Sequence, residues 1–537
     1  PSAASIALNR VGGQEPSGIF GSLTANGQIF LINPSGILFG SSSRVDVGSL
    51  TASTLNITNQ DFLSGNYRFS QMAGYANAGV VNQGVITAGP GGYVALLGAA
   101  VRNEGVVVAN LGSIAMTAGT AATLDMRGDG LIEFVVTDAV SGVVSGPSGE
   151  SLASYVSNTG TLQADGGMVT LTANAATDII KSVVNQEGVI RAQSMEERNG
   201  VVVLSGGPEG IVSVSGTVDV SGTDAGEKGG TVQATGQYVG LFGATINASG
   251  DAGGGTVLVG GDLHGQGTVQ NAFRTYVSSD STINADAITN GNGGKVVVWA
   301  DDTTRYYGSI SARGGARDGD GGFVEVSGKQ YLNFNGTVDT RAPQGKTGTL
   351  LLDPATLTIT DATNTTGTQD TNLTGDNQIL AADADSGGNT VSWGAIDSLA
   401  ATTNIVLEAT GLITVNDVTG AAGGTITANN LVTLDLTTGS LRITSTGGAI
   451  TFADQNDVIR TEGGAITLQA QGGALTAGGL DTTGAAGTTV GNIVLESSST
   501  VSLGTIKTSG TGSLQVTAAG AITQSGILTV AGAATFA

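Results

Sequence analysis

Short apolar strands recur along the chain at a nearly constant interval. One recurring unit places a β-branched residue between polar and small neighbours, and its central residues are Val218, Ile246, Ile283, Ile310 and Val338. The steps between them are 28, 37, 27 and 28 residues, a period of about 27 with one insertion. A second apolar strand follows a glycine inside each period. Because apolar and polar positions alternate and no helical period is present, the pattern predicts an all-β chain.

The length of this period selects among all-β architectures. A propeller blade needs about 40 to 45 residues, whereas a period in the twenties matches one coil of a parallel β-helix. Each strand then pairs with its equivalent in the next coil about 4.8 Å away, so like residues stack on like. At roughly 24 residues per coil, we expect about 22 coils in a stack on the order of 100 Å long.

At candidate corners of the coils, an asparagine recurs with a glycine two or three positions after it. The segments are 82–84, 103–105, 158–160 and 185–188, and the last contains Asn185, Gln186 and Gly188. We expect each asparagine to donate its side-chain amide to its copy in the neighbouring coil. We expect each glycine to take a positive φ.

The amino-acid composition supports a folded repeat protein that is rich in glycine. The 537 residues include 88 glycines, 8 prolines and no cysteine, and hydrophobic and charged residues make up 40% and 12%. A glycine share more than twice the usual value of about 7% disfavours helices, and the missing three-residue period excludes collagen. The apolar content is too high for a disordered linker. We expect no membrane insertion, because no apolar run reaches the roughly 18 residues needed to span a bilayer.

Charge and the scarcity of metal-ligating residues restrict partners and chemistry. The net charge of −23 disfavours nucleic acids and anionic membranes as partners. Without cysteine and with His264 as the single histidine, thiolate zinc sites and multi-histidine sites are excluded. His264 lies in a glycine-rich segment typical of a solvated loop, and the acidic segments 318–320 and 383–389 match no calcium motif. We therefore predict no cofactor, no metal site and no catalytic residue.

The repeat pattern divides the chain into four segments. Residues 1–76 form a distinct N-terminal module, residues 77–354 carry the regular repeat, residues 355–400 are a Thr/Asn/Asp-rich excursion, and residues 401–537 resume a shorter repeat. No capping segment follows the last strand pattern. We expect the repeat to continue or to stack beyond residue 537, and the chain to associate with itself end to end.

The N-terminal module resembles the secretion domain of the filamentous haemagglutinin family. The residues that carry the likeness are 9–11, 16–23, 25–40 and 45–48, and the likeness continues into the repeats. The resemblance implies a right-handed parallel β-helix, export by two-partner secretion through an outer-membrane pore, and a location at or beyond the surface of a Gram-negative cell. The family's domain begins some tens of residues earlier, so Pro1 is expected to be the start of a processed or truncated form.

Two motifs of the family fall on residues of this chain. Its asparagine-arginine motif falls on Asn9 and Arg10, and its asparagine-proline-asparagine-glycine motif falls on Asn33, Pro34, Ser35 and Gly36. Ser35 replaces the family's usual asparagine, a mild change at a turn position. The resemblance implies that these six residues serve secretion.

Three further features are candidate recognition sites. Arg127-Gly128-Asp129 is an integrin-type tripeptide, which can also arise by chance in a glycine-rich chain. Trp299, Tyr306 and Tyr307 form a polar-aromatic cluster that could contact a glycan. Four or five Asn-x-Ser/Thr sites could accept sugars or could simply be turn asparagines; examples are Asn56, Asn247, Asn335 and Asn364.

The leading functional hypothesis is a secreted, non-enzymatic cell-surface fibre or adhesin scaffold. Its expected partners are the secretion pore, a host, neighbouring-cell or matrix surface, and further copies of the chain. One alternative is a β-helix that binds or cleaves polysaccharides, and another is the shaft of a contact-dependent toxin. Cleavage of a glycan would need converging carboxylates or a basic residue, and the cluster around Trp299 supplies neither clearly.

Overall fold

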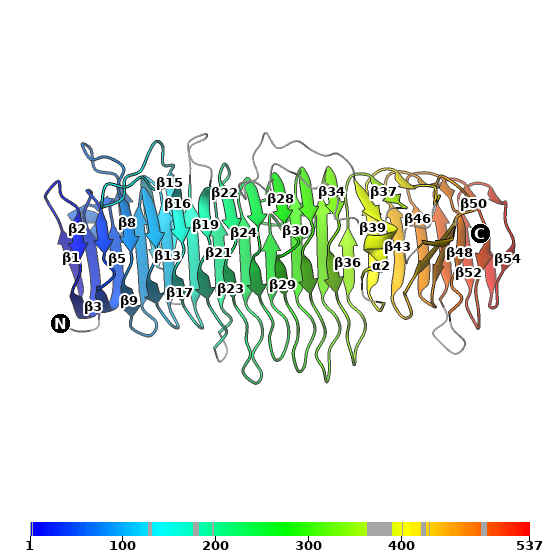
Figure 1. Cartoon of the computed structure of the whole chain (residues 1–537), viewed down its shortest axis with the longest axis horizontal. Helices are drawn as coiled ribbons and strands as arrows, with labels where there is room; N and C mark the ends of the chain where they lie inside the picture. The colour runs from blue at the N-terminus through cyan, green and yellow to red at the C-terminus, as the bar shows by residue number, and fades with distance from the viewer. Residues whose placement is uncertain are drawn as a thin grey trace.

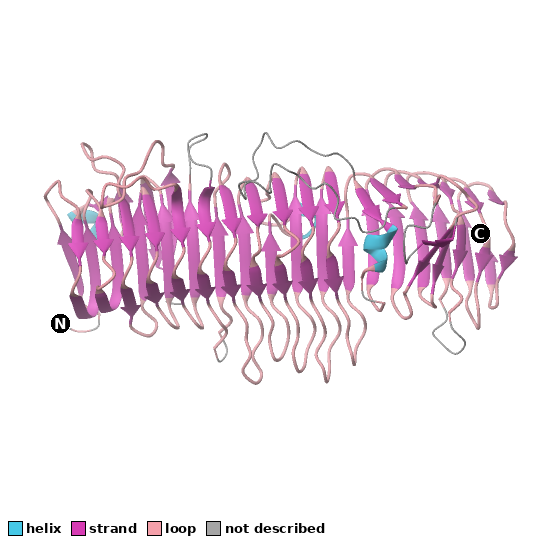
Figure 2. Ribbon diagram, in the orientation of Figure 1, coloured by secondary structure: helices cyan, strands magenta, loops and turns pink. Residues whose placement is uncertain are grey.

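The computed structural model is one elongated stack of parallel strands with the two termini at opposite ends (Figure 1). It describes residues 2, 4–126, 132–174, 182–195, 198–361, 389–399, 401–419, 426–428, 430–484 and 491–537. Strands dominate the described residues, and helices are confined to short segments (Figure 2). No helix among these residues is both long enough and apolar enough to cross a membrane.

One long ladder of parallel strands contributes one strand to each coil. Its strands, in order, are β1 (Ile6–Arg10), β3 (Ser22–Ile32), β5 (Arg44–Ser53), β10 (Tyr93–Gly98), β13 (Ser113–Ala118), β18 (Met168–Ala173), β21 (Val201–Ser205), β24 (Thr231–Thr235), β27 (Thr256–Val259), β30 (Lys295–Ala300), β33 (Phe323–Gly328), β36 (Thr349–Leu352), β39 (Asn404–Ala409), β43 (Ser440–Ser445), β46 (Ala465–Ala470), β49 (Ile493–Ser497), β52 (Leu514–Ala518) and β55 (Ala534–Phe536).

A second ladder branches from β5 and runs beside the first. It contains β9 (Val85–Ala88), β12 (Val106–Val108), β17 (Thr161–Gln163), β20 (Val189–Arg191), β23 (Thr217–Asp219), β26 (Thr245–Asn247), β29 (Thr282–Asn284), β32 (Ser309–Ser311) and β35 (Thr337–Asp339).

A third ladder forms another face of the coils. It contains β2 (Ser17–Ile19), β4 (Ile37–Phe39), β8 (Gly79–Asn82), β11 (Ala100–Asn103), β16 (Ser154–Asn158), β19 (Ser182–Gln186), β22 (Ile211–Val214), β25 (Tyr238–Leu241), β28 (Arg274–Val277), β31 (Thr303–Tyr306), β34 (Tyr331–Phe334), β38 (Thr390–Ser392), β37 (Leu357–Thr360), β40 (Ile413–Val415), β44 (Ile450–Phe452), β47 (Leu475–Thr476), β50 (Val501–Leu503) and β53 (Ile522–Gln524).

Two smaller sheets and three short helical segments complete the described elements. The C-terminal sheet contains β41 (Ile426–Ala428), β42 (Leu431–Leu434), β45 (Val458–Thr461), β48 (Gly479–Asp481), β51 (Ile506–Lys507) and β54 (Leu528–Thr529). An antiparallel sheet near the N-terminus contains β6 (Asn56–Ile57), β7 (Arg68–Ser70), β14 (Ala121–Met126) and β15 (Ile132–Asp138). The helical segments are α1 (Asn59–Leu63), the 3₁₀ turn η1 (Leu263–Gly265) and α2 (Trp393–Asp397).

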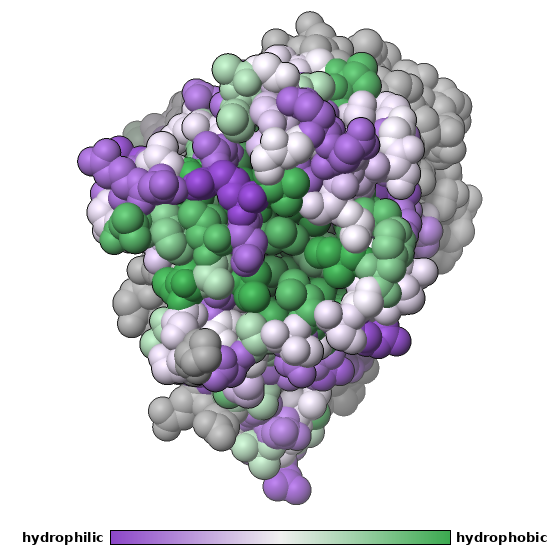
Figure 3. All heavy atoms as spheres, turned by 90° about the vertical axis from the view of Figure 1, so that its left-hand side faces the viewer, coloured by the Kyte–Doolittle hydropathy of each residue, from purple (hydrophilic) through white to green (hydrophobic). Residues whose placement is uncertain are grey.

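The predicted stacking of like residues is confirmed in the core. Val218, Ile246, Ile283, Ile310 and Val338 pair in unbroken succession, and each is at most 2% exposed. Seen from the N-terminal end, apolar residues fill the middle of the coil and polar residues surround them (Figure 3). The all-β parallel β-helix predicted from the period is therefore the fold of the chain.

The coils are longer than the uniform coil assumed from the sequence. The first ladder has eighteen strands within the described residues, which is fewer than the roughly 22 coils expected at 24 residues each. Loops account for the difference, since the paired residues Leu350 and Ile405 lie 55 positions apart. That coil contains the predicted excursion 355–400, of which residues 362–388 and 400 lie outside the described part.

The predicted amide ladder is present, with one correction. Asn82 donates to Asn103 over 2.8 Å, Asn103 to Asn158 over 2.7 Å, and Asn158 to Gln186 over 2.8 Å. Gln186 takes the place expected for Asn185, because Asn158 pairs with Gln186 in the strand register and Asn185 lies on the opposite face. Buried amides therefore satisfy one another from coil to coil.

The glycines beside this ladder have a different role from the one predicted. None of Gly84, Gly105, Gly160 and Gly188 has a positive φ. A Cβ on Gly105 would instead collide with the carbonyl oxygen of Gly84, and the same relation links Gly160 to Gly105 and Gly188 to Gly160. These glycines are required because successive coils approach closely.

Candidate functional site

The two motifs that the family resemblance implicates meet at one corner of the first coils. Strand β1 pairs in parallel with β3, so that Arg10 lies opposite Ile32, the residue before Asn33. The backbone N–H of Val11 donates to the carbonyl oxygen of Ile32 over 2.9 Å and continues this pairing beyond the strand. The fold therefore brings Asn9 and Arg10 beside the turn that begins at Asn33.

Asn33 organises this turn from a fully buried position. Its side chain is 0% exposed, and its Nδ2 donates to the carbonyl oxygen of Glu15 over 3.0 Å and to Oγ of Ser17 over 2.9 Å. Its Oδ1 accepts from the backbone N–H of Ser35 over 2.9 Å. Asparagine suits this position because its amide both donates and accepts.

Gly36 closes the turn in a backbone conformation that favours glycine. Its φ is 120°, and its N–H donates to the carbonyl oxygen of Asn33 over 3.1 Å. Its own carbonyl oxygen accepts from the N–H of Ser17 over 3.0 Å. A side chain here would be strained and would also lie 3.3 Å from Cβ of Pro147. Pro34 is buried and Ser35 is half-buried, so Ser35 is the most accessible residue of this turn.

Arg10 ties the first strand to the helical excursion beside it. Its Nη2 donates to the carbonyl oxygen of Ile57 over 2.6 Å, and its Nη1 donates to Oδ1 of Asn59 over 3.1 Å. Asn59 begins α1, whose N-cap is Thr58. Both Asn9 and Arg10 are exposed. The corner thus presents a cation and an amide on a surface shaped by the buried turn.

The structure does not bring the predicted aromatic cluster together on one surface. Tyr306 is 0% exposed in the core, where its ring stacks on Phe334, and burial raises its pKa. Tyr307 is half-buried on the opposite face and contacts Tyr276 edge-on, and burial raises its pKa too. Trp299 is buried in a third cluster. The three rings therefore have three separate environments.

The other predicted recognition sites, the Arg-Gly-Asp tripeptide and the Asn-x-Ser/Thr sites, lie partly outside the described residues. Arg127, Gly128 and Asp129 lie outside the described residues, as does Asn364. Among the Asn-x-Ser/Thr sites of the described residues, Asn56, Asn247 and Asn335 are half-buried. These features stay predictions.

A buried acidic group beside His264 escaped the sequence interpretation. His264 lies in η1, where its backbone N–H donates to Oε2 of Glu325 over 3.1 Å and its Nδ1 lies 3.1 Å from Oδ2 of Asp353. Glu325 is 0% exposed, and burial raises its pKa to about 7. Burial also raises the pKa of Asp353. The loop expected to be solvated is therefore anchored to two carboxyl groups.

The loops on the edge of the regular coils form a groove with both apolar and polar lining residues. Its volume is about 730 Å³, and it is lined in part by Asn247, Asp286, Arg313 and Arg341. Arg313 pairs with Asp286 over 2.7 Å, and the pKa of its guanidinium is raised by that hydrogen bond. Arg341 pairs in the same way with Asp339 over 2.6 Å. The groove offers hydrogen-bonding groups of the kind that bind sugars or anions.

Comparisons with known proteins associate the N-terminal part of the chain with secretion. The model of the TPS secretion domain, where TPS stands for two-partner secretion, matches residues 1–220. A model described as repeats of unknown function matches residues 490–537. The crystal structure of the HMW1 secretion domain from Haemophilus influenzae is similar with a TM-score of 0.55 and 34% identity, over 66% of this chain and 87% of that chain.

Curated relatives are similar over a shorter part. A heme/hemopexin-binding protein of Haemophilus influenzae is 30% identical over 211 residues, and a second protein of that name is 26% identical over 228 residues. Each match covers 38% of this chain, but it covers only 22% of the first relative and 23% of the second. The chain thus matches about a fifth of the length of these relatives.

Proposed function

The chain belongs to the two-partner secretion exoproteins, and from this membership we propose that it crosses the outer membrane of a Gram-negative bacterium through a partner pore and forms a rod at the cell surface. Each coil contacts its neighbours in the stack, so the β-helix can fold coil by coil as the chain emerges. The absence of cysteine suits such a route, because disulfides hinder passage of an unfolded chain.

The corner formed by Asn9, Arg10 and the turn 33–36 is the part of the folded secretion module that we assign to export. The observation that carries this assignment is the register of β1 and β3, which places Arg10 opposite Ile32 and so unites two motifs that are distant in the sequence. Asn33, Pro34 and Gly36 support the shape of the corner, and Asn9, Arg10 and Ser35 are its accessible groups.

Once exported, the rod serves as a non-enzymatic binding or adhesive surface toward a host, a neighbouring cell or a matrix. Two observations support this role. The relatives in the comparison are named as binding proteins. The groove lined by Arg313 and Arg341 lies along the side of the coils and offers charged and polar groups without an enclosed cleft.

Several finer points stay predictions. Self-association into filaments, the four segment boundaries and adhesion through Arg127-Gly128-Asp129 belong to this group. The alternative functions are polysaccharide binding or cleavage and the shaft of a contact-dependent toxin. Release of new reducing ends from acidic glycans by the purified chain would favour the polysaccharide-cleaving alternative over a non-enzymatic rod.

Export through a partner pore has a direct test. The full chain, preceded by a secretory signal peptide, is produced in a Gram-negative host with and without a two-partner secretion pore. The proposal predicts chain in the medium or on the cell surface only when the pore is present. Equal release with and without the pore would contradict it, as would retention of the chain in the periplasm in both strains.

A further inference from the structure

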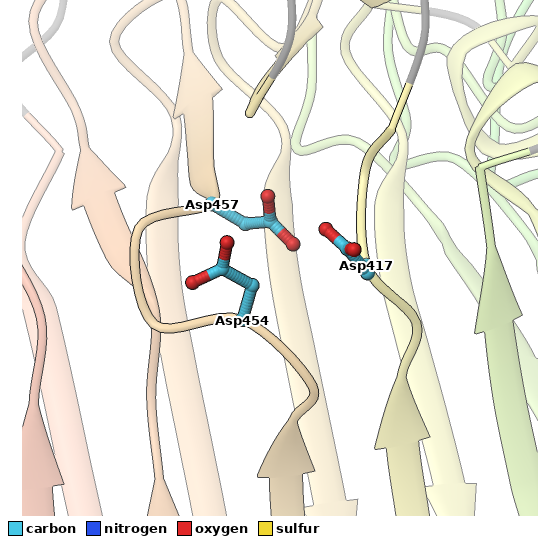
Figure 4. A group of neighbouring side chains, drawn as sticks. All are labelled: Asp417, Asp454 and Asp457. Atoms are coloured by element: carbon cyan, nitrogen blue, oxygen red, sulfur yellow. The ribbon is translucent and has the colours of Figure 1, made fainter.

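Three aspartates from two neighbouring coils converge beside the C-terminal sheet. Asp417 follows β40, and Asp454 and Asp457 lie between β44 and β45. Strands β40 and β44 pair directly, with Ile413 opposite Ile450, so the two coils are adjacent. One oxygen from each carboxylate lies within 4.8 Å of the others. Figure 4 shows the carboxylate of Asp457 directed toward Asp417, with Asp454 beside it.

Asp457 supplies the observation that separates this group from an ordinary acidic surface cluster. Its side chain is 1% exposed, and its Oδ2 accepts from the backbone N–H of Val418 over 3.0 Å. Its Oδ1 is buried and has no hydrogen-bond partner. A buried carboxylate oxygen without a partner is costly, and the cost rises when two other carboxylates face it.

The surrounding residues hold the aspartates in place without neutralising them. Nδ2 of Asn430 donates to Oδ2 of Asp454 over 3.1 Å, and the backbone N–H of Asn456 donates to its Oδ1 over 2.9 Å. No lysine or arginine in the described part of the chain forms an ion pair with the three aspartates. Arg460, three residues after Asp457, pairs instead with Asp481 over 3.0 Å.

We propose that Asp417, Asp454 and Asp457 bind a hard divalent cation, and specifically calcium. Carboxylate oxygens are the ligands that calcium prefers, and its six to eight positions can be completed by water because Asp417 is exposed and Asp454 is half-buried. Magnesium demands a tighter octahedral arrangement and gives up its waters reluctantly, so it fits this open triad less well. The bound ion links two successive coils.

Electrostatics at Asp457 agrees with this assignment. Burial raises its pKa first, and the nearby charges of Asp417 and Asp454 raise it further. A divalent cation reverses that effect, because it favours the charged form of all three carboxylates. Calcium binding is therefore expected to stabilise the folded chain and to weaken as the pH falls.

Calorimetric titration of the metal-free full chain with calcium chloride tests the proposal. We expect one calcium per chain, with a dissociation constant of roughly 10⁻⁴ to 10⁻³ M, as in extracellular calcium modules. The unfolding temperature should rise when calcium is added and should rise less when magnesium is added. The absence of both heat and a thermal shift in the unmodified chain would overturn the proposal, and equal or tighter magnesium binding would overturn the choice of calcium.

Substitutions locate the site. Asp457→Asn should abolish calcium binding and raise the unfolding temperature in a chelator, since it removes a buried charge. Asp454→Asn, at a half-buried position, should also abolish binding and serves if Asp457→Asn fails to fold. Asp435→Asn removes the same charge at an exposed position nearby in the sequence and should leave binding unchanged. Undiminished calcium binding in both triad variants would overturn the assignment.

Discussion

Nδ2 of Asn103 donates a hydrogen bond of 2.7 Å to Oδ1 of Asn158, although 55 positions separate the two residues in the sequence. Both side chains are 0% exposed. The bond is one step of a ladder that also includes Asn82 and Gln186. A buried amide is tolerated here only because the next coil presents a matching amide, so the ladder fixes the register between coils as well as stabilising them.

Asn103→Ala should destabilise the folded chain more than a comparable change on the other face of the strand. The substitution removes the acceptor of Asn82 and the donor to Asn158 in a buried corner, and we expect a loss of about 1 to 3 kcal/mol. Asn185→Ala is the matched control outside the ladder and should change the unfolding free energy by less than about 0.5 kcal/mol. Urea unfolding followed by circular dichroism measures both. Equal losses would show that the ladder carries no special stability.

Gly105→Ala should destabilise the fold through close approach of coils. The new Cβ would collide with the carbonyl oxygen of Gly84, and backbone cannot move aside as a flexible side chain can. Overpacking of this kind costs about 1 to 3 kcal/mol or more. Gly21→Ala is the control, because nothing lies within 4 Å of its added Cβ and its φ is not positive. If both variants unfold at the same urea concentration, the close-approach explanation is wrong.

Glu325→Gln should change the pH dependence of stability. Burial raises the pKa of Glu325 from an ordinary 4.5 to about 7 in the folded chain. Between these values the folded state binds more protons than the unfolded state, so this group makes stability fall as the pH rises from about 4.5 to 7. The glutamine variant can still accept from the N–H of His264 but cannot ionise, so it should gain stability relative to the unmodified chain above pH 7.

Thermal unfolding at pH 5 and at pH 8 checks this expectation. The difference in stability between Glu325→Gln and the unmodified chain should be larger at pH 8 than at pH 5. Glu462→Gln, at an exposed position, should show no such change between the two pH values. A variant that loses stability equally at both pH values would indicate a packing effect instead. Asp353 and Glu408, whose pKa values burial also raises, remain intact in every variant.

The fold was predictable because a β-helix repeats its local pattern. Val218, Ile246 and Ile283 stack as their spacing predicts, and so do Asn82, Asn103 and Asn158. Strand alternation also explains why two predictions were wrong, namely the place of Asn185 in the amide ladder and the grouping of Tyr306 with Tyr307. Successive residues in a strand face opposite sides, which puts Gln186 rather than Asn185 in the ladder and separates Tyr306 from Tyr307. The role of Gly105 could not be seen in one repeat, because it depends on the backbone of the previous coil.

The candidate sites were less predictable because they join distant parts of the chain. His264 meets Glu325 and Asp353 across 61 and 89 positions. Glu325 lies in the periodic strand β33 and Asp353 directly follows β36, but His264 lies in a loop that has no periodic signal. The corner of the secretion module was found through the resemblance to a family. What the sequence did not contain was its geometry, in which Asn33 is buried and holds the turn while Arg10 is exposed.

Export of two asparagine variants through a partner pore tests the central claim most directly. Asn33→Ala disrupts the corner, whereas Asn103→Ala weakens the stack but leaves the corner intact. We predict that the chain recovered outside the cell falls about tenfold for Asn33→Ala, as expected if about 1.4 kcal/mol of recognition is lost, and stays near the unmodified level for Asn103→Ala. Normal export of Asn33→Ala, or an equal loss for both variants, would contradict the assignment of this corner to secretion.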